Sequence, residues 1–326
     1  MSVCLVISCT EQPSVIENEA FGEAQGSTYS VKFISDEEQD LKSAFDSIFK
    51  AFDASMSTYQ PNSKISAVNI GDTTIVVDPM FIAVLSRSNQ IAKETQGQFD
   101  VTVGPLVDLW GFGKKTHLEI DSAKIDSTKQ FVGYKMISWN SSKVEIPKGY
   151  RIDFNAIAQG YTVDVIAAFL EKKGIDRYMV EVGGEVRAKG LNRQNEAWKI
   201  GVDKPSEEID QEDRFQLIVG LKDKALATSG NYRKFWVDQV TGIKYAHTID
   251  PISGFPARNQ LLSATLIANN CMDADGYATA CMVMGTEKAL KFVESKPDLE
   301  AYLIYSDENG DWQVAQTTGF ANYVVK

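Results

Sequence analysis

The chain has 326 residues, of which 44% are hydrophobic, so it can bury a full core as one large domain or two ordinary ones. Its 44 acidic residues outnumber its 33 basic residues, which gives a formal net charge of -11 at pH 7. This charge repels phosphate backbones and therefore excludes nucleic acid as a general partner. A small anionic ligand would need local help from backbone N–H groups, a helix N-terminus or a divalent cation.

The N-terminal segment MSVCLVISCT contains a candidate lipidation site. Val6-Ile7-Ser8-Cys9 fits the bacterial lipoprotein cleavage pattern, in which the cysteine after a small residue is lipidated, and a polar tether follows. The segment has no basic residue and falls short of the apolar stretch of about 7 to 15 residues in a secretory leader, so either the leader is trimmed or the match is accidental. We expect a lipoprotein with a truncated leader and tether at residues 1–20 and one domain at 21–326.

The first half of this domain is predicted to begin with a strand and an amphipathic helix. Residues 28–34 alternate in the manner of a strand, and residues 37–55 carry apolar side chains at helical spacing. A turn-rich loop at 56–63 and a helix at 78–95, closed by Gly97, follow. The next segment, GQFDVTVGPLVDLWGFGKK, has aromatic residues and glycines without a clear period, which is typical of an irregular core segment or a ligand wall.

The second half of the domain is richer in strands. A strand at 143–153 and a helix at 156–173 are followed by two strands joined through a tight turn at Gly183-Gly184. The other elements predicted by pattern are strands at 198–202, 215–221, 225–228, 234–238, 245–249 and 263–268, helices after Ala274 and at 286–295, and closing strands around Tyr302 and Trp312. Adjacent strands mixed with a few long helices predict an α+β fold with mixed, largely antiparallel sheets and several packed helices.

The segment RIDFNAIAQGYTVD places polar side chains where a strand gives way to a helix. Asp153 and Asn155 would lie beside the free N–H groups and the positive dipole end of that helix, which together form a ready anion site. The alternative is that Asn155 only caps the helix. Gly160, one turn into the helix, costs about 1 kcal/mol relative to alanine unless something must approach closely, which favours a functional role.

The segment DADGYATA, residues 273–280, places two carboxylates and a hydroxyl at the start of a helix. Asp273 can cap this helix, while Asp275 and Thr279 are four residues apart and share one face. Carboxylates and hydroxyls suit a hard divalent cation such as Mg²⁺. The alternative is a solvated face with a local hydrogen bond, because this spacing is common near helix starts.

His247 is one of only two histidines in the chain. It ends a predicted strand beside the turn-forming Asp250-Pro251, in the segment KYAHTIDPISGFPA. An imidazole with an unperturbed pKa of about 6.5 suits proton transfer near neutral pH, although a lone histidine is more often structural. The residues alone leave both roles open.

Four cysteines are too few for a disulfide framework. Cys4 and Cys9 belong to the leader, which leaves Cys271 and Cys281 in the domain. Export would allow these two to be bridged, but we expect two buried free thiols.

Taken together, the motifs resemble the ApbE family of FAD:protein FMN transferases, which attach FMN covalently to a threonine of a target protein. The resemblance covers roughly residues 22–320 and rests on seven motifs in order: STYQPNSKISAVN, GQFDVTVGPLVDLWGFG, IDFNAIAQGYTVD, VEVGGEVRAKG, ATSGNYRKFW, HTIDPISGFP and DADGYATA. It implies an ApbE-like, T-fold-like architecture. Because many members are lipid-anchored outside the cytoplasmic membrane, it also implies a periplasmic protein anchored to the inner membrane through Cys9.

The resemblance further implies a metal site and a flavin cleft. Mg²⁺ would be bound by the side chains of Asp275 and Thr279, and the carbonyl groups of Ala156 and Ala278 would complete the site. The cation would hold the pyrophosphate of FAD between the two acidic corners of the protein. The implied FAD-binding residues are Tyr59, Phe99, Asp100, Asp153, Gln159, His247 and Thr248.

In the implied reaction, the acceptor threonine attacks the FMN-side phosphorus of FAD and AMP leaves. His247 is the first candidate for the base that takes the threonine proton, and Asp250 is the second. The acceptor would be a membrane-bound or exported redox subunit of the Na⁺-translocating NADH:quinone reductase or Rnf type. Two alternatives remain: hydrolysis of FAD to FMN and AMP, and a non-enzymatic FAD-binding lipoprotein.

Two positions depart from the family pattern. Gln159 stands where many relatives have lysine, so one positive contact to the nucleotide is missing. Ala24-Gln25-Gly26-Ser27 stands where relatives often have Thr-Met-Gly-Thr, so no methionine occupies the place of the usual FAD contact. Neither change affects the implied metal ligands.

Overall fold

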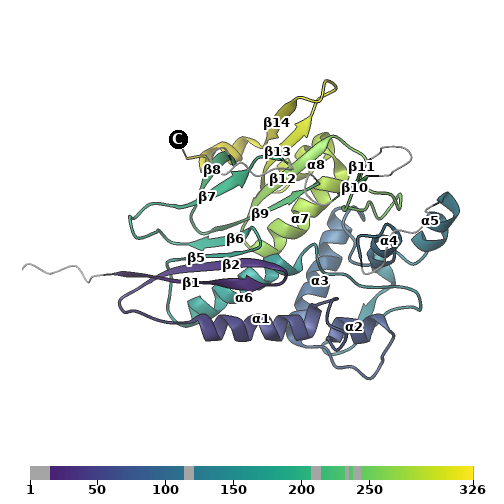
Figure 1. Ribbon diagram of the computed structural model, residues 1–326, viewed down its shortest axis with the longest axis horizontal. Coiled ribbons are helices and arrows are strands. Elements are labelled where there is room, and N and C mark those ends of the chain that lie inside the picture. The colour runs from purple at the N-terminus through teal and green to yellow at the C-terminus, as the bar shows by residue number, and fades with distance from the viewer. Residues whose placement is uncertain (1–14, 114–120, 207–213, 232–234, 238–243, 326) are drawn as a thin grey trace, which may run out of the picture.

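The structure is a computed structural model that describes residues 15–113, 121–206, 214–231, 235–237 and 244–325 (Figure 1). The predicted leader, with Cys9, lies outside these ranges. Within them, no helix combines the length and the apolar character needed to cross a membrane.

An eight-stranded sheet forms the centre of the molecule (Figure 1), and every neighbouring pair of its strands is antiparallel. From edge to edge the strands are β1 (Ile16–Ala24), β2 (Ser27–Ser35), β5 (Tyr178–Val182), β6 (Glu185–Lys189), β9 (Lys224–Gly230), β12 (Leu261–Ala268), β13 (Glu300–Ser306) and β14 (Trp312–Gln316). The arrangement confirms the α+β class with largely antiparallel sheets.

The remaining described strands form three two-stranded sheets. They are β3 (Ser138–Trp139) with β4 (Val144–Glu145), β7 (Trp198–Asp203) with β8 (Phe215–Leu221), and β10 (Phe235–Val237) with β11 (Lys244–Ala246). Strands β7 and β8, with the 3-10 helix η2 (Thr318–Tyr323), cover one face of the large sheet through a shared apolar cluster.

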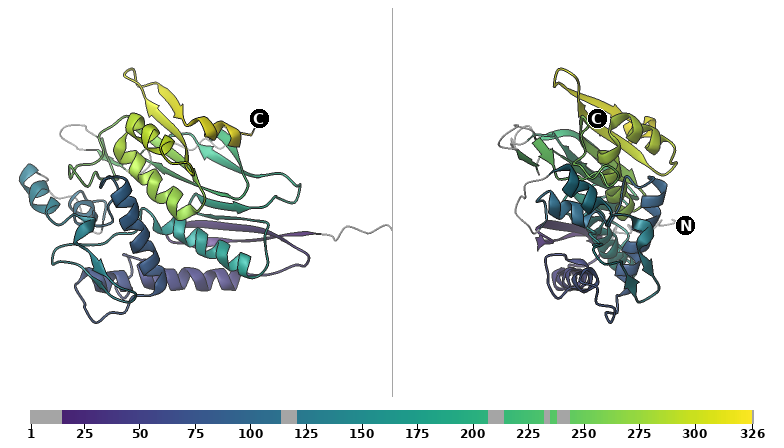
Figure 2. Two further views of the ribbon diagram at one scale, coloured as in Figure 1. Left: turned by 180° about the vertical axis from the view of Figure 1, so that it is seen from behind. Right: turned by 90° about the vertical axis from the view of Figure 1, so that its right-hand side faces the viewer.

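Helices cover the opposite face of the large sheet, as Figure 2 shows for α6 (Ala158–Lys172) and α7 (Cys271–Met284). Val180 and Val182 of β5 share a buried apolar cluster with Ile166 and Leu170 of α6, while α7 packs on β9 and β12. The other helices are α1 (Lys42–Met56), α2 (Lys64–Asn69), α3 (Pro79–Glu94), α4 (Gly104–Leu109), α5 (Ser122–Lys129), η1 (Tyr134–Met136) and α8 (Thr286–Glu294).

Cys271 and Cys281 both lie on α7. Both side chains are buried and both thiols are free. This confirms the prediction of two buried free thiols in the domain.

Strand β1 was not predicted, and it begins at Ile16, inside the expected tether; the strand predicted at 28–34 is β2. Asn18 explains why, because its buried side chain donates a 2.7 Å hydrogen bond to the Ser35 hydroxyl and accepts one of 2.7 Å from the Gln39 backbone. The folded part of the chain therefore starts before the predicted boundary at residue 21.

Two other predicted boundaries are wrong. The strand expected at 143–153 is limited to β4, because Pro147 lacks a ladder donor and Gly149, at φ +94°, turns the chain. The helix expected from residue 37 starts at Lys42, since the preceding residues form the turn that binds Asn18. The short helices α2, α4, α5 and η1 and the two-residue strand β3 were not predicted.

Candidate functional site

Helices α6 and α7 meet closely at Gly160. A Cβ atom on Gly160 of α6 would lie 2.4 Å from the carbonyl oxygen of Cys271 and 2.8 Å from the Cβ of Asp275. On α7, a Cβ atom on Gly276 would lie 2.7 Å from the Ile91 side chain of α3 and only at ordinary contact distance, 3.4 Å, from Ile157. Gly160 is therefore required because another helix of the same chain occupies the space of a side chain.

Asp275 is a buried carboxylate at this contact. It is 6% exposed, and its Oδ2 accepts a 3.0 Å hydrogen bond from the backbone N–H of Gly160. Burial raises the pKa of Asp275 to about 7, and the hydrogen bond from Gly160 opposes this shift only in part. No positively charged side chain among the described residues offsets the burial of this carboxylate. Such a group favours a bound cation.

Thr279 lies one turn further along the same face of α7, and its hydroxyl is 3.2 Å from the Ser229 hydroxyl. Ala278 is buried, and Ala156, just before α6, packs on the same apolar core as α7. The described part of the chain contains no cluster of three or more His, Cys, Asp or Glu side chains that could hold a metal ion. A cation here would use one carboxylate, a hydroxyl, carbonyls, water and ligand oxygens, a donor set that suits Mg²⁺.

A small pocket lies at the other acidic corner, with walls that include Tyr59, Phe112, Arg151, Asp153 and Asn155. Asp153 is 9% exposed, and its Oδ1 accepts a 2.8 Å hydrogen bond from the Asn155 backbone. Burial raises the pKa of Asp153, while the Asn155 N–H and the Arg151 charge oppose that shift. Tyr59 is 69% exposed at this pocket, so its ring is accessible for stacking on a planar ligand.

His247 belongs to a segment between this pocket and a larger groove. Its ring centroid is 6.4 Å from that of Phe112, a wall of the pocket, in an edge-on arrangement. The next residue, Thr248, donates a 2.7 Å hydrogen bond to Asn231 Oδ1, and Asn231 lines the groove. His247 itself lines neither cavity, but its ring contacts a wall of the pocket and its chain neighbour Ala246 lines the groove.

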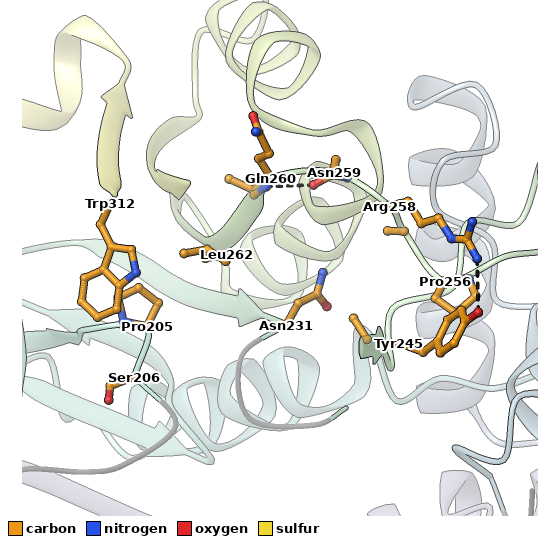
Figure 3. A pocket seen from close by; sticks show the side chains of 13 residues that line it. Pro205, Ser206, Asn231, Tyr245, Pro256, Arg258, Asn259, Gln260, Leu262 and Trp312 are labelled. Atoms are coloured by element: carbon orange, nitrogen blue, oxygen red, sulfur yellow. Dashed lines mark hydrogen bonds between the residues drawn. The ribbon is translucent and has the colours of Figure 1, made fainter. Parts of the chain in front are cut away.

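The groove has a volume of about 610 Å³, within the range of roughly 300 to 1,000 Å³ typical of ligand sites. Figure 3 shows Trp312 of β14 on one side, Tyr245 of β11 on the other, and Asn231 between them. Arg258 lies over the Tyr245 ring at 5.5 Å and over the Phe255 ring at 5.4 Å. The groove thus combines aromatic side chains with the positive charge of Arg258.

Asp250, the second candidate base, shapes the loop after His247. Its Oδ1 accepts a 2.9 Å hydrogen bond from the backbone N–H of Ile252. The loop is also held by Gly254, at φ +81°, whose carbonyl accepts a 2.8 Å hydrogen bond from the Trp110 indole. The Asp250 carboxylate therefore stabilises the turn through its hydrogen bond with Ile252.

Three residues expected in the FAD cleft make contacts within the protein itself. Phe99 is 2% exposed in the main apolar cluster. Asp100 is 7% exposed and accepts hydrogen bonds from Thr102 and from the backbone N–H of Tyr134. Gln159 lies against the β5–β6 turn, where a Cβ on Gly183 would be 2.6 Å from its Nε2. For these three, contact with FAD stays a prediction.

Neither of the two residues predicted to cap a helix, Asn155 and Asp273, is the N-cap in the structure. Asn270 caps α7, because its Oδ1 accepts a 2.8 Å hydrogen bond from the Asp273 N–H and its backbone is extended. Asp273 instead forms an ion pair of 2.5 Å with Arg87. Helix α6 has Ile157 at its N-cap without a side-chain hydrogen bond, so Asn155 lies outside the helix.

These features define an α+β protein with an enzyme-like site: a buried carboxylate suited to a cation, a second acidic pocket, and a histidine beside that pocket. The sequence profile of the ApbE family matches residues 25–303. The chain is 34% identical to an FAD:protein FMN transferase of Vibrio cholerae, over 91% of this chain and 90% of the relative. It is also 34% identical to one from Haemophilus influenzae, over 93% and 90%. The chain belongs to the ApbE family.

Solved structures agree with this assignment. The flavin transferase ApbE from Vibrio cholerae has a TM-score of 0.82 and 32% identity, covering 95% of this chain and 100% of the relative. The flavinyl transferase ApbE from Pseudomonas stutzeri has a TM-score of 0.84 and 29% identity, covering 95% and 97%. The predicted ApbE-like architecture is confirmed.

Sequence reasoning missed three side chains at the site. Ser229, which contacts Thr279, directly follows the strand predicted at 225–228, and no pattern marks it as part of the site. Arg151 stands two residues before Asp153 on an extended segment, and this spacing alone could have indicated a shared side of the chain. Phe112 lies in a segment without a period, so no pattern marks it.

Proposed function

We propose that this protein transfers FMN from FAD to a threonine hydroxyl of an acceptor protein, with release of AMP and dependence on Mg²⁺. The observation that carries the proposal is Asp275 at the contact of α6 and α7. Its carboxylate is buried, and no positively charged side chain among the described residues offsets its charge. Family membership supplies the reaction, because both relatives compared by sequence are named FAD:protein FMN transferases.

The residues of the α6–α7 contact fit the proposed cation. Asp275 and Thr279 would provide side-chain oxygens, and Ala156 and Ala278 would provide carbonyl oxygens. When bound, Mg²⁺ supplies positive charge to phosphate oxygens. The chain contributes burial of the carboxylate and, through Gly160, a close and fixed contact between the two helices.

His247 would accept the proton of the acceptor hydroxyl. In this step a bond forms between the threonine Oγ and the FMN-side phosphorus, the bond from that phosphorus to the bridging oxygen breaks, and AMP leaves with the electron pair. Neutral threonine is a weak nucleophile, so a base within hydrogen-bond reach is required. The place of His247 between pocket and groove supports it as the base, whereas Asp250 is engaged with Ile252.

The two alternative functions are less well supported. Hydrolysis of FAD would use the same site with water in place of threonine, and a non-enzymatic FAD-binding lipoprotein would need the cleft without the metal. The names of the relatives specify a protein as the acceptor, which favours transfer.

Co-expression with a candidate acceptor domain, followed by intact mass measurement, tests the proposal. We expect an FMN-sized mass gain on the acceptor that requires both FAD and Mg²⁺. The matched control is the acceptor with its threonine replaced by alanine, which should gain no mass. Free FMN and AMP beside an unmodified acceptor would establish hydrolysis, and bound FAD without turnover would establish a binding protein; either result overturns the proposal.

We also propose that the protein is periplasmic and anchored to the inner membrane through a lipid on Cys9. Its acceptor would then be a membrane-bound or exported redox subunit of the Na⁺-translocating NADH:quinone reductase or Rnf type. The support is the lipoprotein-type sequence Val6-Ile7-Ser8-Cys9. Sequencing the mature N-terminus and weighing its first peptide tests the anchor, and an unmodified Cys9 on a cytoplasmic protein would contradict it.

A further inference from the structure

Asp164 of α6 connects that helix to the start of α7. Its Oδ1 accepts a 3.0 Å hydrogen bond from the backbone N–H of Cys271, and its Oδ2 accepts one of 2.9 Å from the N–H of Met272. Both N–H groups belong to the first turn of α7, where a helix has no internal acceptors for them. A carboxylate also suits the positive end of the helix dipole. Helix α7 thus receives a side chain of another helix at its first two N–H groups, in addition to its N-cap Asn270.

Arg187 of β6 holds this carboxylate in place. Its Nη1 donates a 2.8 Å hydrogen bond to Asp164 Oδ1, and the Asp164 side chain is only 12% exposed. Charge-assisted hydrogen bonds of this kind fix the orientation of the acceptor as well as its position. The central sheet, α6 and α7 are therefore joined at a single carboxylate.

The contact is reciprocated one turn earlier along α6. Gly160, four residues before Asp164, donates its N–H to Asp275, which lies four residues after Cys271 on α7. The start of each helix therefore receives a carboxylate from the other helix. Two contacts fix the position and the rotation of α7 on α6, and one of them uses the proposed metal ligand.

We propose that Asp164, supported by Arg187, is a positioning residue for the cation site. Its contact with α7 does not depend on Asp275, so it keeps Asp275 aligned with the start of α6 when that carboxylate turns to a cation. The inference rests on the Mg²⁺ dependence of the proposed function. A plain helix cap would affect thermal stability alone, whereas a positioning residue also affects the affinity of the folded protein for the cation.

Mn²⁺ binding to the FAD-free protein tests this difference. The paramagnetic resonance signal of free Mn²⁺ measures the binding, and displacement of Mn²⁺ by Mg²⁺ shows that both ions use the same site. For Asp164→Asn we expect about 10- to 100-fold weaker binding, as is typical when residues that orient metal ligands are lost. FMN transfer by this variant should recover at saturating Mg²⁺ with an unchanged KM for FAD.

Glu171→Gln is the matched control. Glu171 lies on the same helix, 3.5 Å from Arg187 and hydrogen-bonded to Tyr178, but it makes no described hydrogen bond or ion pair with α7. The Tm of the Glu171→Gln variant should fall, while its affinity for Mn²⁺ should equal that of the wild type. Arg187→Gln leaves the Asp164 carboxylate in place and should weaken Mn²⁺ binding to a smaller extent, which keeps the test available if Asp164→Asn does not fold.

The outcomes separate this inference from the proposed function. Equal Mn²⁺ affinity in the wild type and the folded variants at Asp164 or Arg187 would overturn the inference and leave Asp164 a structural cap. A wild-type protein that binds Mn²⁺ but leaves the acceptor mass unchanged would contradict the proposed function and not the inference. A wild-type protein that binds no Mn²⁺ in the absence of FAD would overturn the inference, and the acceptor mass would then decide the proposed function separately.

Discussion

Asp275 shows at the scale of a single residue how burial prepares a site for a ligand. We expect Asp275→Ala to weaken Mg²⁺ binding by more than about 100-fold, because it removes the only carboxylate of the proposed donor set. Mg²⁺-dependent FMN transfer should be lost with it. Titration calorimetry on the FAD-free protein measures the affinity directly.

Asp273→Asn is the control for this change, because Asp273 lies on the same helix but pairs with Arg87. The control should lose some stability and keep the Mg²⁺ affinity of the wild type. Unchanged turnover of Asp275→Ala at limiting Mg²⁺ would rule out the metal assignment.

His247 leads to a second prediction at this scale. His247→Ala should slow transfer by about 10²- to 10⁴-fold, the usual contribution of a general base, while FAD still binds. Fluorescence titration measures FAD binding, and the acceptor mass against time gives the rate. Asp250→Asn, which keeps an oxygen for the Ile252 N–H, should transfer at nearly the wild-type rate. Normal transfer by His247→Ala across neutral pH would place the base elsewhere.

Some of these residues could be predicted from the sequence and others could not. The spacing of Asp275 and Thr279 is local, so a helix period is enough to place them on one face. Asp164 occupies a polar position on a helix, and its partner Cys271 is more than a hundred residues away. A local pattern cannot distinguish such a residue from a solvated one.

The contact between α6 and α7 gives a prediction at the scale of elements. Gly160→Ala would place a methyl group 2.4 Å from the carbonyl oxygen of Cys271, a backbone atom that cannot rotate away. We expect a loss of about 3 kcal/mol in the free energy of unfolding, the upper end of the usual cost of overpacking. Mg²⁺ affinity should fall as well, because the two helices must separate. Urea denaturation and calorimetry measure the two effects.

Gly276→Ala is the comparison for this variant. Its methyl group would lie 2.7 Å from the Cδ1 end of the Ile91 side chain, which can change rotamer. The loss of stability should therefore be smaller. Equal effects of the two substitutions would show that the helix contact is not the cause.

An ion network joins α3, α7 and the turn after α8. Glu94 accepts hydrogen bonds of 2.6 Å from Tyr277 and 2.5 Å from Lys296. Burial alone would raise the pKa of Glu94, but these hydrogen bonds outweigh it and lower the pKa below its usual 4.5. A carboxylate with a lowered pKa adds stability above the unfolded value and loses it as the pH falls through the folded value.

Glu94→Gln should accordingly lower the free energy of unfolding by about 1 kcal/mol at pH 7. The gap to the wild type should narrow as the pH falls below 4.5, where the unfolded carboxylate is protonated, and close once the pH has passed the lower pKa of the folded state. Glu287→Gln is the control, since its exposed pair with Lys291 lies within α8 alone and should contribute nothing measurable. A gap that persists unchanged in acid would refute the electrostatic origin.

Periodicity predicted long elements well and short ones poorly. Helices α3 and α6 have apolar residues at helical spacing over several turns, so their positions were confirmed. The six-residue helix α2 is too short to show a period. The stretch after β4 looks like a strand by composition, but Pro147 prevents it from pairing.

At the scale of the whole molecule, the site is assembled from distant parts of the chain. The sheet places β2 next to β5 and β6 next to β9, pairings that no local pattern specifies. The order of motifs, through the family resemblance, predicted that these parts meet, but only the structure shows that α6 and α7 meet at their N-terminal turns.

This assembly predicts that the ligands stabilise the entire fold. A cation bound between α6 and α7 would tie together helices that cover adjoining strands, so it binds only the folded state. A ligand at 100 times its dissociation constant then adds about 2.7 kcal/mol, which corresponds to a few degrees in Tm. Thermal unfolding with FAD, and with FAD plus Mg²⁺, should show a further increase due to Mg²⁺ in the wild type and none in Asp275→Ala. If Mg²⁺ raised the Tm of both proteins equally, the cation would bind outside the α6–α7 contact.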